Sequence, residues 1–493
     1  MAIDQVEMST NPFDDDKLHE ECGVFGLYGH PDSAAHVALG LHALQHRGQE
    51  AAGIVSFDGT HFHSHRSLGS VGDHFSEANV IGQLKGRSAI GHVRYSTSGE
   101  TVLRNVQPLF ADLAGGGLAI AHNGNITNAT QLRRQLEKRG SIFQSTMDTE
   151  VIVHLIATCS RQDFVEKFID ALHHLLGAYS LVIQTHEGLI GARDPHGVRP
   201  LVLGELDGSY ILCSETCALD IIGAKFVRDI DPGEVVVIDE DGLRSLRPFR
   251  TSVQKRFCVF EYIYFSRPDS VVEGINVYES RKKIGAELAK EYGVDADLVV
   301  PVPDSGVPGA IGYAEYANLP FDLGIIRNHY VGRTFIEPMD SIRHLGVRLK
   351  HNANRAALAG KRVVLVDDSI VRGTTSTKIV ELVRAAGAKE VHMRIASPPT
   401  SHSCFYGVDT PERSQLLAYQ MDTQAMGEYI GVDSLAFISI DGMYRAMGFV
   451  GRDNDSPQMC DACFTGDYPI ALTDHLDGEE SAQLSLLDET SEK

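Results

Sequence analysis

The sequence predicts two domains in succession: a layered α+β domain with antiparallel sheets, followed by an α/β domain with a doubly wound parallel sheet. Three observations lead to this prediction. The chain has 493 residues, which is too long for one ordinary hydrophobic core. Short β-rich runs divided by Gly, Asn and Asp turns fill the chain from Cys22 to about residue 250. After about residue 255, buried apolar runs alternate with amphipathic helical segments.

The composition is that of a soluble globular protein, with 43% hydrophobic and 22% charged residues. The formal net charge of −22 argues against nucleic-acid and acidic-membrane partners, because such partners require a basic surface. No apolar run approaches the ~18 residues of a membrane span, and the N-terminus lacks the basic and apolar regions of a signal peptide. We therefore expect a cytoplasmic protein.

In the first domain, the runs CGVFGLYG, LAIAHNG, YSLVIQ and EVVVID indicate strands, and residues 129–139 and 149–158 indicate helices. Residues 1–21 contain seven carboxylates and no apolar periodicity, so they indicate a solvated tail or a removable leader. We expect this leader to be removed and the domain to span residues 22–252.

The second domain, expected over residues 253–470, contains DLVVPVP, then VVLVDD leading into STKIVELVRAAGA, then EVHMRIAS. Such alternation of apolar strands with helices is typical of a parallel sheet covered on both faces. Residues 471–493 form an acidic C-terminal tail, and we expect its last twenty or so residues to be mobile.

One segment of this second domain, VVLVDDSIVRGTT at residues 363–375, has the pattern of a phosphate site. Asp367 and Asp368 end a buried strand, where open α/β sheets bind ligands, and could bind a hard cation and ribose hydroxyls. The amides and hydroxyls of residues 372–375 precede a helix and could cradle a phosphate. The alternative, a polar turn with Asp caps, is less consistent with the whole pattern.

The segment resembles the phosphoribosyl pyrophosphate signature of the type I phosphoribosyltransferases. VVPVPDSGVPGA, at residues 299–310, resembles the pyrophosphate loop of that family, although a Gly-rich turn is the alternative. The basic segment 327–350 resembles its closing loop, although a solvated basic loop would look the same. The resemblance implies Mg²⁺ at Ser305, Asp367 and Asp368. The substrate contacts that it implies are Asp304, Ser305, Gly306, Asp367, Asp368, Ser369, Arg372, Gly373, Thr374 and Thr375, with Arg333 and Lys350 on the closing loop.

Cys22 opens the first predicted strand, and a thiol at a chain terminus can use its own α-amine as base. This requires cleavage after Glu21, and a buried strand cysteine is the alternative. Four segments, HRGQEAAG, GHVRYST, AHNGNITN and STMDTE, resemble motifs of the N-terminal-nucleophile glutamine amidotransferases, which have a four-layer αββα fold. The resemblance implies that Asn123 and the Gly124 amide form an oxyanion hole. It also implies that Arg94, Asp148 and Arg47 bind glutamine, with Arg47 supporting the Cys22 terminus.

Cys460 and Cys463 form a CxxC pair, which in a cytosolic chain indicates zinc, an iron–sulfur cluster or redox chemistry. With Cys258 and Cys404 they match the 4Fe-4S ligands of one branch of the glutamine phosphoribosyltransferases. Zinc remains the alternative metal, because four thiolates suit it equally well. We expect the other cysteines, Cys159, Cys213 and Cys217, to be core residues.

Together, residues 22–470 resemble the amidophosphoribosyltransferase family. The resemblance implies conversion of phosphoribosyl pyrophosphate and glutamine to phosphoribosylamine, glutamate and pyrophosphate at the start of purine synthesis. It also implies a homotetramer inhibited by purine nucleotides. The alternatives are glutaminase enzymes of hexosamine or asparagine synthesis, which would carry another second domain. A regulator that senses phosphoribosyl pyrophosphate would need a DNA-binding domain and would have no use for Cys22.

Overall fold

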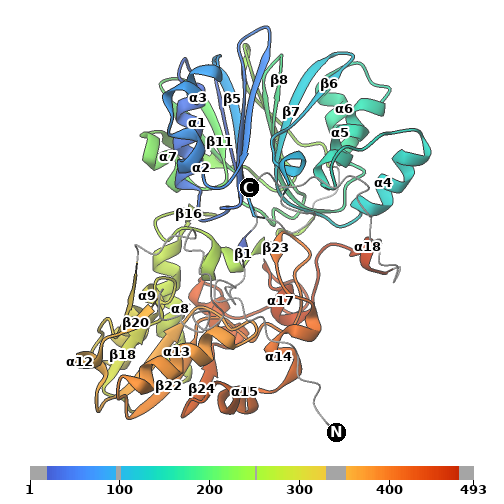
Figure 1. Cartoon of the computed structure of the whole chain (residues 1–493). Coiled ribbons are helices and arrows are strands. Elements are labelled where there is room, and N and C mark those ends of the chain that lie inside the picture. Colours follow the sequence, from blue (N-terminus) through green and yellow to red (C-terminus); the bar gives the residue numbers. More distant parts are fainter. Residues whose placement is uncertain (1–18, 21, 96–101, 250–252, 329–350, 477–493) are drawn as a thin grey trace.

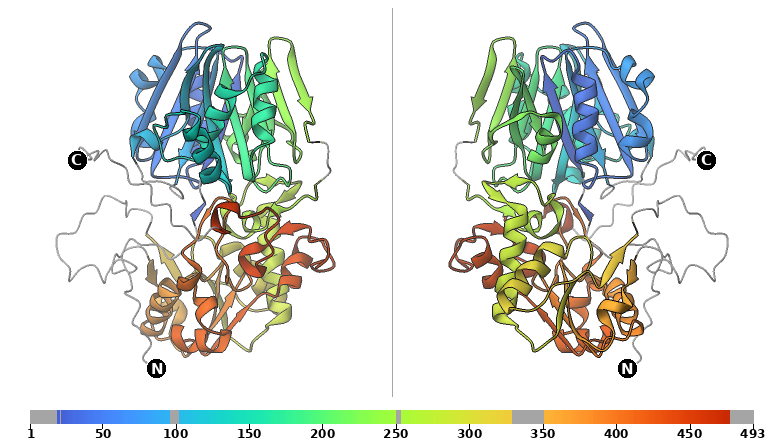
Figure 2. Two further views of the ribbon diagram at one scale, coloured as in Figure 1. Left: turned by 90° about the vertical axis from the view of Figure 1, so that its right-hand side faces the viewer. Right: turned by 90° about the vertical axis from the view of Figure 1, so that its left-hand side faces the viewer.

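A computed structural model describes residues 19–20, 22–95, 102–249, 253–328 and 351–476 of the chain. The chain forms two domains, the first above the second in Figure 1. The side views of Figure 2 show the blue-to-green first domain stacked on the yellow-to-red second domain. No helix among the described residues is both long and apolar enough to cross a membrane.

The first domain contains two antiparallel sheets, as predicted. One sheet has seven strands, in the order β12 (Lys225–Asp229), β10 (Val202–Leu206), β11 (Ser209–Cys213), β2 (Gly23–Tyr28), β5 (Ser88–Arg94), β3 (Ala51–Phe57) and β4 (Phe62–Leu68). The other has six, in the order β14 (Gly242–Leu246), β13 (Val235–Asp239), β9 (Leu189–Arg193), β8 (Gly177–Thr185), β7 (Gly116–Ile126) and β6 (Leu109–Leu113).

Helices cover the outer face of each sheet, which gives four layers (Figure 1). Apolar residues such as Val24, Ile90 and Val182 fill the space between the two sheets. The outer face of the seven-stranded sheet packs on α1 (Ser33–Ala43) and α7 (Thr216–Ile222). That of the six-stranded sheet packs on α4 (Ala129–Lys138), α5 (Thr149–Thr158) and α6 (Phe164–Leu172). The αββα prediction is therefore confirmed.

The second domain contains a parallel sheet in the order β18 (Leu298–Pro301), β21 (Arg362–Asp367), β22 (Glu390–Ile395) and β24 (Ser434–Phe437). Val364 and Val366 of β21 belong to the core on one face, with α8 (Val277–Glu291), α9 (Val307–Ala317) and α16 (Ile440–Ala446). Val363 and Leu365 belong to the core on the other face, with α13 (Thr374–Ala385) and α15 (Thr423–Ile430). Both faces of the sheet are buried, which explains why its strands are continuously apolar.

The two domains share one apolar core, because Ala178 and Val198 of the first pack in the same cluster as Phe260 and Tyr406 of the second. Two chain ends also cross the boundary. The strand β1 (His19–Glu20) pairs with β23 (Val408–Asp409) of the second domain. The short helix α18 (Thr473–Leu476) lies beside α4, where the Asp474 carboxylate accepts the amides of Thr130 and Gln131.

The start of the predicted acidic tail is therefore docked on the first domain, because its carboxylate caps a helix N-terminus. The expectation that this part of the tail is mobile is therefore wrong for Asp474. Most of the predicted leader and the rest of the tail lie outside the described residues.

Candidate active site

Cys22 lies immediately before β2, the central strand of the seven-stranded sheet. Its side chain is buried, and its backbone N–H donates to the Arg47 carbonyl oxygen at 3.2 Å. The next residue, Gly23, pairs with Val93 of β5 in antiparallel register. Cys22 therefore lies beside Arg94, the last residue of β5, and the two predicted site residues come together although they are distant in sequence.

Asn123 and Gly124 lie on β7 of the facing sheet. The His92 ring of β5 donates through Nε2 to the His122 carbonyl oxygen at 3.0 Å, which brings the oxyanion residues next to the strand that ends at Arg94. Asn123 is fully buried, and neither its amide oxygen nor its amide nitrogen has a hydrogen-bond partner among the described residues. A buried polar group costs free energy unless it is satisfied, so a ligand at this position would complete it.

Gly124 has a φ of +137°, a conformation that other residues rarely adopt. A Cβ at this position would lie 2.0 Å from the Ala178 carbonyl oxygen of the neighbouring strand. Only glycine therefore fits here, and its amide is fixed next to the unsatisfied Asn123 side chain.

Asp148 lies at the N-terminus of α5 and is mostly buried. The Ile126 amide donates to its Oδ2 at 2.9 Å, and His122 Nδ1 lies 3.6 Å from the same atom. Burial alone would raise the pKa of Asp148, but His122 and the amide hydrogen bonds lower it below the usual range. The carboxyl group is therefore anionic at neutral pH, as a group that binds an ammonium must be.

The second site lies at the carboxyl edge of the parallel sheet. Asp367 is the last residue of β21, and Asp368 follows it, with both side chains buried. The Asp368 amide donates to Asp367 Oδ1 at 2.9 Å, and the Ser369 hydroxyl donates to Asp368 Oδ1 at 2.6 Å. Gly373, with a φ of +82°, precedes α13, and the amides of its first turn are those available to a phosphate.

The predicted pyrophosphate loop lies next to this edge. The Val302 amide donates to the Val366 carbonyl oxygen at 2.8 Å. A Cβ on Gly306 would lie 2.3 Å from the same oxygen, so glycine allows the loop to approach β21. Asp304 is exposed and forms an ion pair with Arg327. Ser305 lies between Asp304 and Gly306 in this loop. Arg333 and Lys350 of the predicted closing loop lie outside the described residues.

The four cysteines predicted to bind a metal come together. Cys258 and Cys460 are direct partners in a two-stranded parallel sheet formed by β15 (Phe257–Cys258) and β25 (Met459–Cys460). Both line one pocket with Cys404 and Cys463. Its remaining walls are mainly apolar and include Val198, Phe260, Tyr406, Val408 and Ala462.

Burial raises the pKa of the Cys258 thiol to about 12, and it raises the pKa of Cys460 and Cys463 well above the usual range. A bound metal would favour the thiolates that these surroundings otherwise disfavour. Within the described ranges, no three His, Cys, Asp or Glu side chains are arranged as ligands of a single metal ion.

A group of buried charged residues at the domain boundary has no motif in the sequence: Arg199, Glu215, Glu261 and Arg281. The Arg47 guanidinium contacts this group, since its Nη2 lies 2.7 Å from Glu261 Oε2 and its Nε pairs with Glu215. The one sequence signal is Glu261 itself, a lone carboxylate within the apolar run FCVFEYIYF. A charge in such a run must be paired when it is buried.

Each of the two domains contains a segment that matches a known protein family. Residues 92–220 match a glutamine amidotransferase domain, and residues 273–397 match a phosphoribosyl transferase domain. The fold and the two sites thus define a glutamine-dependent transferase that acts on a phosphoribosyl substrate. A Rhizobium etli amidophosphoribosyltransferase is 59% identical over 482 residues, covering 97% of each chain. A Bacillus subtilis amidophosphoribosyltransferase is 48% identical and covers 92% of this chain and 95% of its own.

The chain therefore belongs to the amidophosphoribosyltransferase family. A solved structure of the B. subtilis glutamine phosphoribosylpyrophosphate amidotransferase, complexed with ADP and GMP, has a TM-score of 0.87 and 47% identity, and covers 92% of this chain and 98% of its own. The enzyme converts phosphoribosyl pyrophosphate and glutamine to phosphoribosylamine, glutamate and pyrophosphate in purine synthesis. The hexosamine and asparagine alternatives are excluded, because the second domain is a phosphoribosyltransferase.

Proposed function

We propose that Cys22 is the nucleophile of the glutamine reaction and that removal of residues 1–21 exposes its α-amine as the base. The thiolate attacks the glutamine carboxamide carbon, and the carbon–nitrogen bond breaks with release of ammonia. Water then hydrolyses the glutamyl thioester to glutamate and regenerates the thiol. The position of Cys22 beside Arg94 supports this role.

The neighbouring residues have roles suited to their charge. Asn123 and the Gly124 amide donate to the oxyanion that develops on the carboxamide oxygen. Arg94 binds the α-carboxylate of glutamine, and Asp148 binds its α-ammonium. The observation that carries the proposal is Asn123, a buried amide with neither polar atom satisfied among the described residues.

The ammonia then displaces pyrophosphate from C1 of the ribose at the second site. Asp367 and Asp368 orient the ribose hydroxyls, and with Ser305 they would hold Mg²⁺. When bound, Mg²⁺ neutralises charge on the leaving pyrophosphate. The remaining contacts divide between the pyrophosphate loop (Asp304, Gly306), the 5-phosphate loop (Ser369, Arg372, Gly373, Thr374, Thr375) and the closing loop (Arg333, Lys350). The buried carboxylates at the edge of β21 support this assignment.

We assign Cys258, Cys404, Cys460 and Cys463 to a 4Fe-4S cluster, which would place this enzyme in the iron–sulfur, leader-containing branch of its family. The shared pocket with its mainly apolar walls supports the assignment, since such clusters are bound by four cysteine thiolates. An electron-transfer role is not implied, because a cluster that links the three chain segments carrying these cysteines can be purely structural. Iron and sulfide analysis of protein prepared without oxygen tests this, and zinc alone would refute it.

The enzyme is proposed to act in the cytoplasm as a homotetramer inhibited by purine nucleotides. The nucleotides bound by the solved B. subtilis relative support this regulation. Its domains are proposed to span residues 22–252 and 253–470, with the acidic tail at residues 471–493. Regulation is tested by titrating the purified enzyme with purine nucleotides.

The experiment that tests the proposed function measures pyrophosphate release and the N-terminal mass of the purified enzyme. Release should require phosphoribosyl pyrophosphate together with glutamine, or with high ammonia in place of glutamine. Mass spectrometry should show Cys22 as the first residue. An active enzyme that retains Met1 would contradict the terminal-nucleophile mechanism.

A further inference from the structure

Three fully buried charged side chains meet at the domain boundary. Arg47 and Arg199 belong to the first domain, and Glu261 belongs to the second. Glu261 pairs with both arginines, because its Oε2 lies 2.7 Å from Arg47 Nη2 and its Oε1 lies 3.0 Å from Arg199 Nη1. One carboxylate from the second domain therefore fixes two guanidinium groups of the first.

The ion pair between Glu261 and Arg47 is connected to Cys22 through the backbone of Arg47. The Arg47 carbonyl oxygen accepts the Cys22 N–H, and removal of the leader makes this nitrogen the α-amine. The side chain of Arg47 thus fixes the backbone group that contacts the proposed base. A shift of Arg47 would move that contact.

The ion pair between Glu261 and Arg199 is connected to the proposed oxyanion hole through residues 405–407. Arg199 Nε donates to the Tyr406 carbonyl oxygen at 2.9 Å, and Gly407 follows directly. A Cβ on Gly407 would lie 2.9 Å from Gly124 Cα, so the two glycines are in close contact. The neighbouring Phe405 carbonyl oxygen accepts Asn125 Nδ2 at 2.9 Å. Residues 405–407 therefore pack directly on the strand that carries the proposed oxyanion donors.

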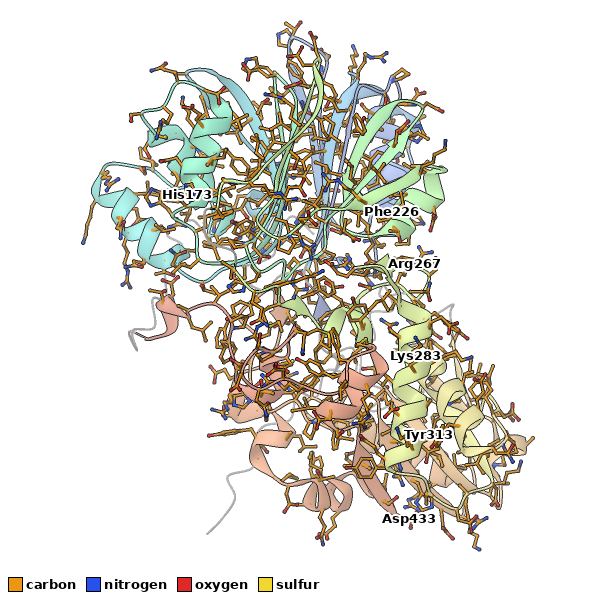
Figure 3. The ribbon with its side chains drawn as sticks, turned by 180° about the vertical axis from the view of Figure 1, so that it is seen from behind. His173, Phe226, Arg267, Lys283, Tyr313 and Asp433 are labelled. Carbon is orange, nitrogen blue, oxygen red and sulfur yellow. The ribbon has the colours of Figure 1, made fainter. Side chains whose placement is uncertain are left out.

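The carboxylate itself is firmly placed. Glu261 is the first residue of a short π-helix, η2 (Glu261–Phe265). The Ser266 hydroxyl donates to Glu261 Oε2 at 2.6 Å. The buried Arg281 of α8 donates to the carbonyl oxygens of Tyr262 and Ser266 at 2.8 and 2.7 Å. Arg267, which follows Ser266 in the chain, is labelled in Figure 3 and lies at the boundary between the two domains.

We propose that Glu261 is a positioning residue for the glutamine reaction, which fixes Cys22 through Arg47 and the oxyanion glycine Gly124 through Arg199 and residues 405–407. This inference rests on the roles proposed above for Cys22 and Gly124. The two ion pairs described for Glu261 both lie on the side of the glutamine site, so we expect its effect to fall on glutamine use.

The test is Glu261→Gln, which keeps the size of the side chain but leaves two buried guanidinium groups without its charge. A small displacement of reacting groups can lower turnover on the order of 100-fold. We expect a loss of this size in kcat with glutamine, with little change in KM, because none of the contacts described above for Glu261 involves Arg94 or Asp148. Synthesis from ammonia should keep its kcat.

The matched control is Glu273→Gln. Glu273 pairs with Arg193 across the same boundary at 2.5 Å, and the two side chains are 11% and 1% exposed. Arg193 Nε also donates to the Arg199 carbonyl oxygen at 2.7 Å, but Glu273→Gln leaves both groups of this hydrogen bond in place, and none of the contacts described for the pair involves Cys22 or Gly124. The control should therefore keep the ratio of glutamine-dependent to ammonia-dependent turnover. Arg199→Lys is a second test, because it keeps the charge but removes the Nε donor to Tyr406, and it should lower only glutamine turnover.

A selective loss of glutamine turnover in Glu261→Gln, absent from Glu273→Gln, supports the proposal. Equal loss of both activities, or no loss of either, overturns it. If Glu261→Gln does not fold, the same two outcomes are read from Arg199→Lys. Glutamine use that survives in Cys22→Ala would instead refute the proposed nucleophile, so the two failures are distinguishable.

Discussion

The two sites differ in how their polar groups are satisfied within the protein. In the glutamine site, the buried Asn123 amide has no partner among the described residues. In the phosphoribosyl site, Asp367 and Asp368 accept hydrogen bonds from the residues that directly follow them. The first site thus presents neutral donors to a charge that develops during the reaction, and the second presents anions to a cation and hydroxyls. The difference teaches that each site is organised for its own chemistry.

Asp367→Asn combined with Asp368→Asn should have the largest effect. Hydrogen bonds to charged groups contribute about 1.5–3 kcal/mol each, so losing two predicts a decrease on the order of 1000-fold in kcat/KM for phosphoribosyl pyrophosphate. Steady-state assays should show this decrease with glutamine and with ammonia alike. The control, Asp297→Asn, changes a half-buried carboxylate next to the opposite end of the same strand and should alter neither. A decrease seen with glutamine alone would contradict the assignment of these two carboxylates to the phosphoribosyl site.

Glu215→Gln should destabilise the glutamine domain by about 3 kcal/mol, because it removes one of the two carboxylates that pair with the buried Arg47 guanidinium. Burial alone would raise the pKa of Glu215, but Arg47 and His46 hold it far below the usual range. A lowered pKa stabilises the fold above the unfolded value of about 4.3 and loses that effect as the pH falls further.

Denaturant unfolding should therefore show the full difference between wild type and Glu215→Gln from pH 7 to 5, and a shrinking difference below about pH 4.3. The control, Asp231→Asn, breaks an exposed pair with Arg247 and should cost less than about 1 kcal/mol. A difference that grows on acidification would contradict the sign of the pKa shift.

Asn123→Ala tests the glutamine site by removing one proposed oxyanion donor. Loss of one oxyanion donor lowers kcat by about 100-fold to 1000-fold in comparable sites, and glutamine-dependent turnover should fall by that amount. Ammonia-dependent turnover serves as the internal control and should not change. If both rates fell together, Asn123 would be a structural residue of the core.

The phosphoribosyl site could be predicted from sequence because its parts are contiguous. The run VVLVDD became β21 and the residues after it became α13, close to the predicted bounds. The predicted helices at 129–139 and 149–158 match α4 and α5 equally well. In each segment, local hydrophobic periodicity and the tertiary fold favour the same structure.

The boundary group could not be predicted, because its partners are far apart in sequence. Arg47 and Glu261 are separated by 214 positions, and Arg199 and Glu261 by 62. Periodicity marks Glu261 as anomalous within an apolar run, but it does not identify which charge pairs with it. The docked start of the acidic tail was also missed, since a carboxylate that caps a distant helix has no local signal.

The central claim is that one chain carries two chemically separate sites, and Cys22→Ala tests it most directly. Pyrophosphate release should be measured with saturating phosphoribosyl pyrophosphate, first with glutamine and then with high ammonia. The account predicts that release with glutamine is abolished while release with ammonia continues at the wild-type rate. Loss of both activities in a folded variant, or survival of glutamine use, would contradict it.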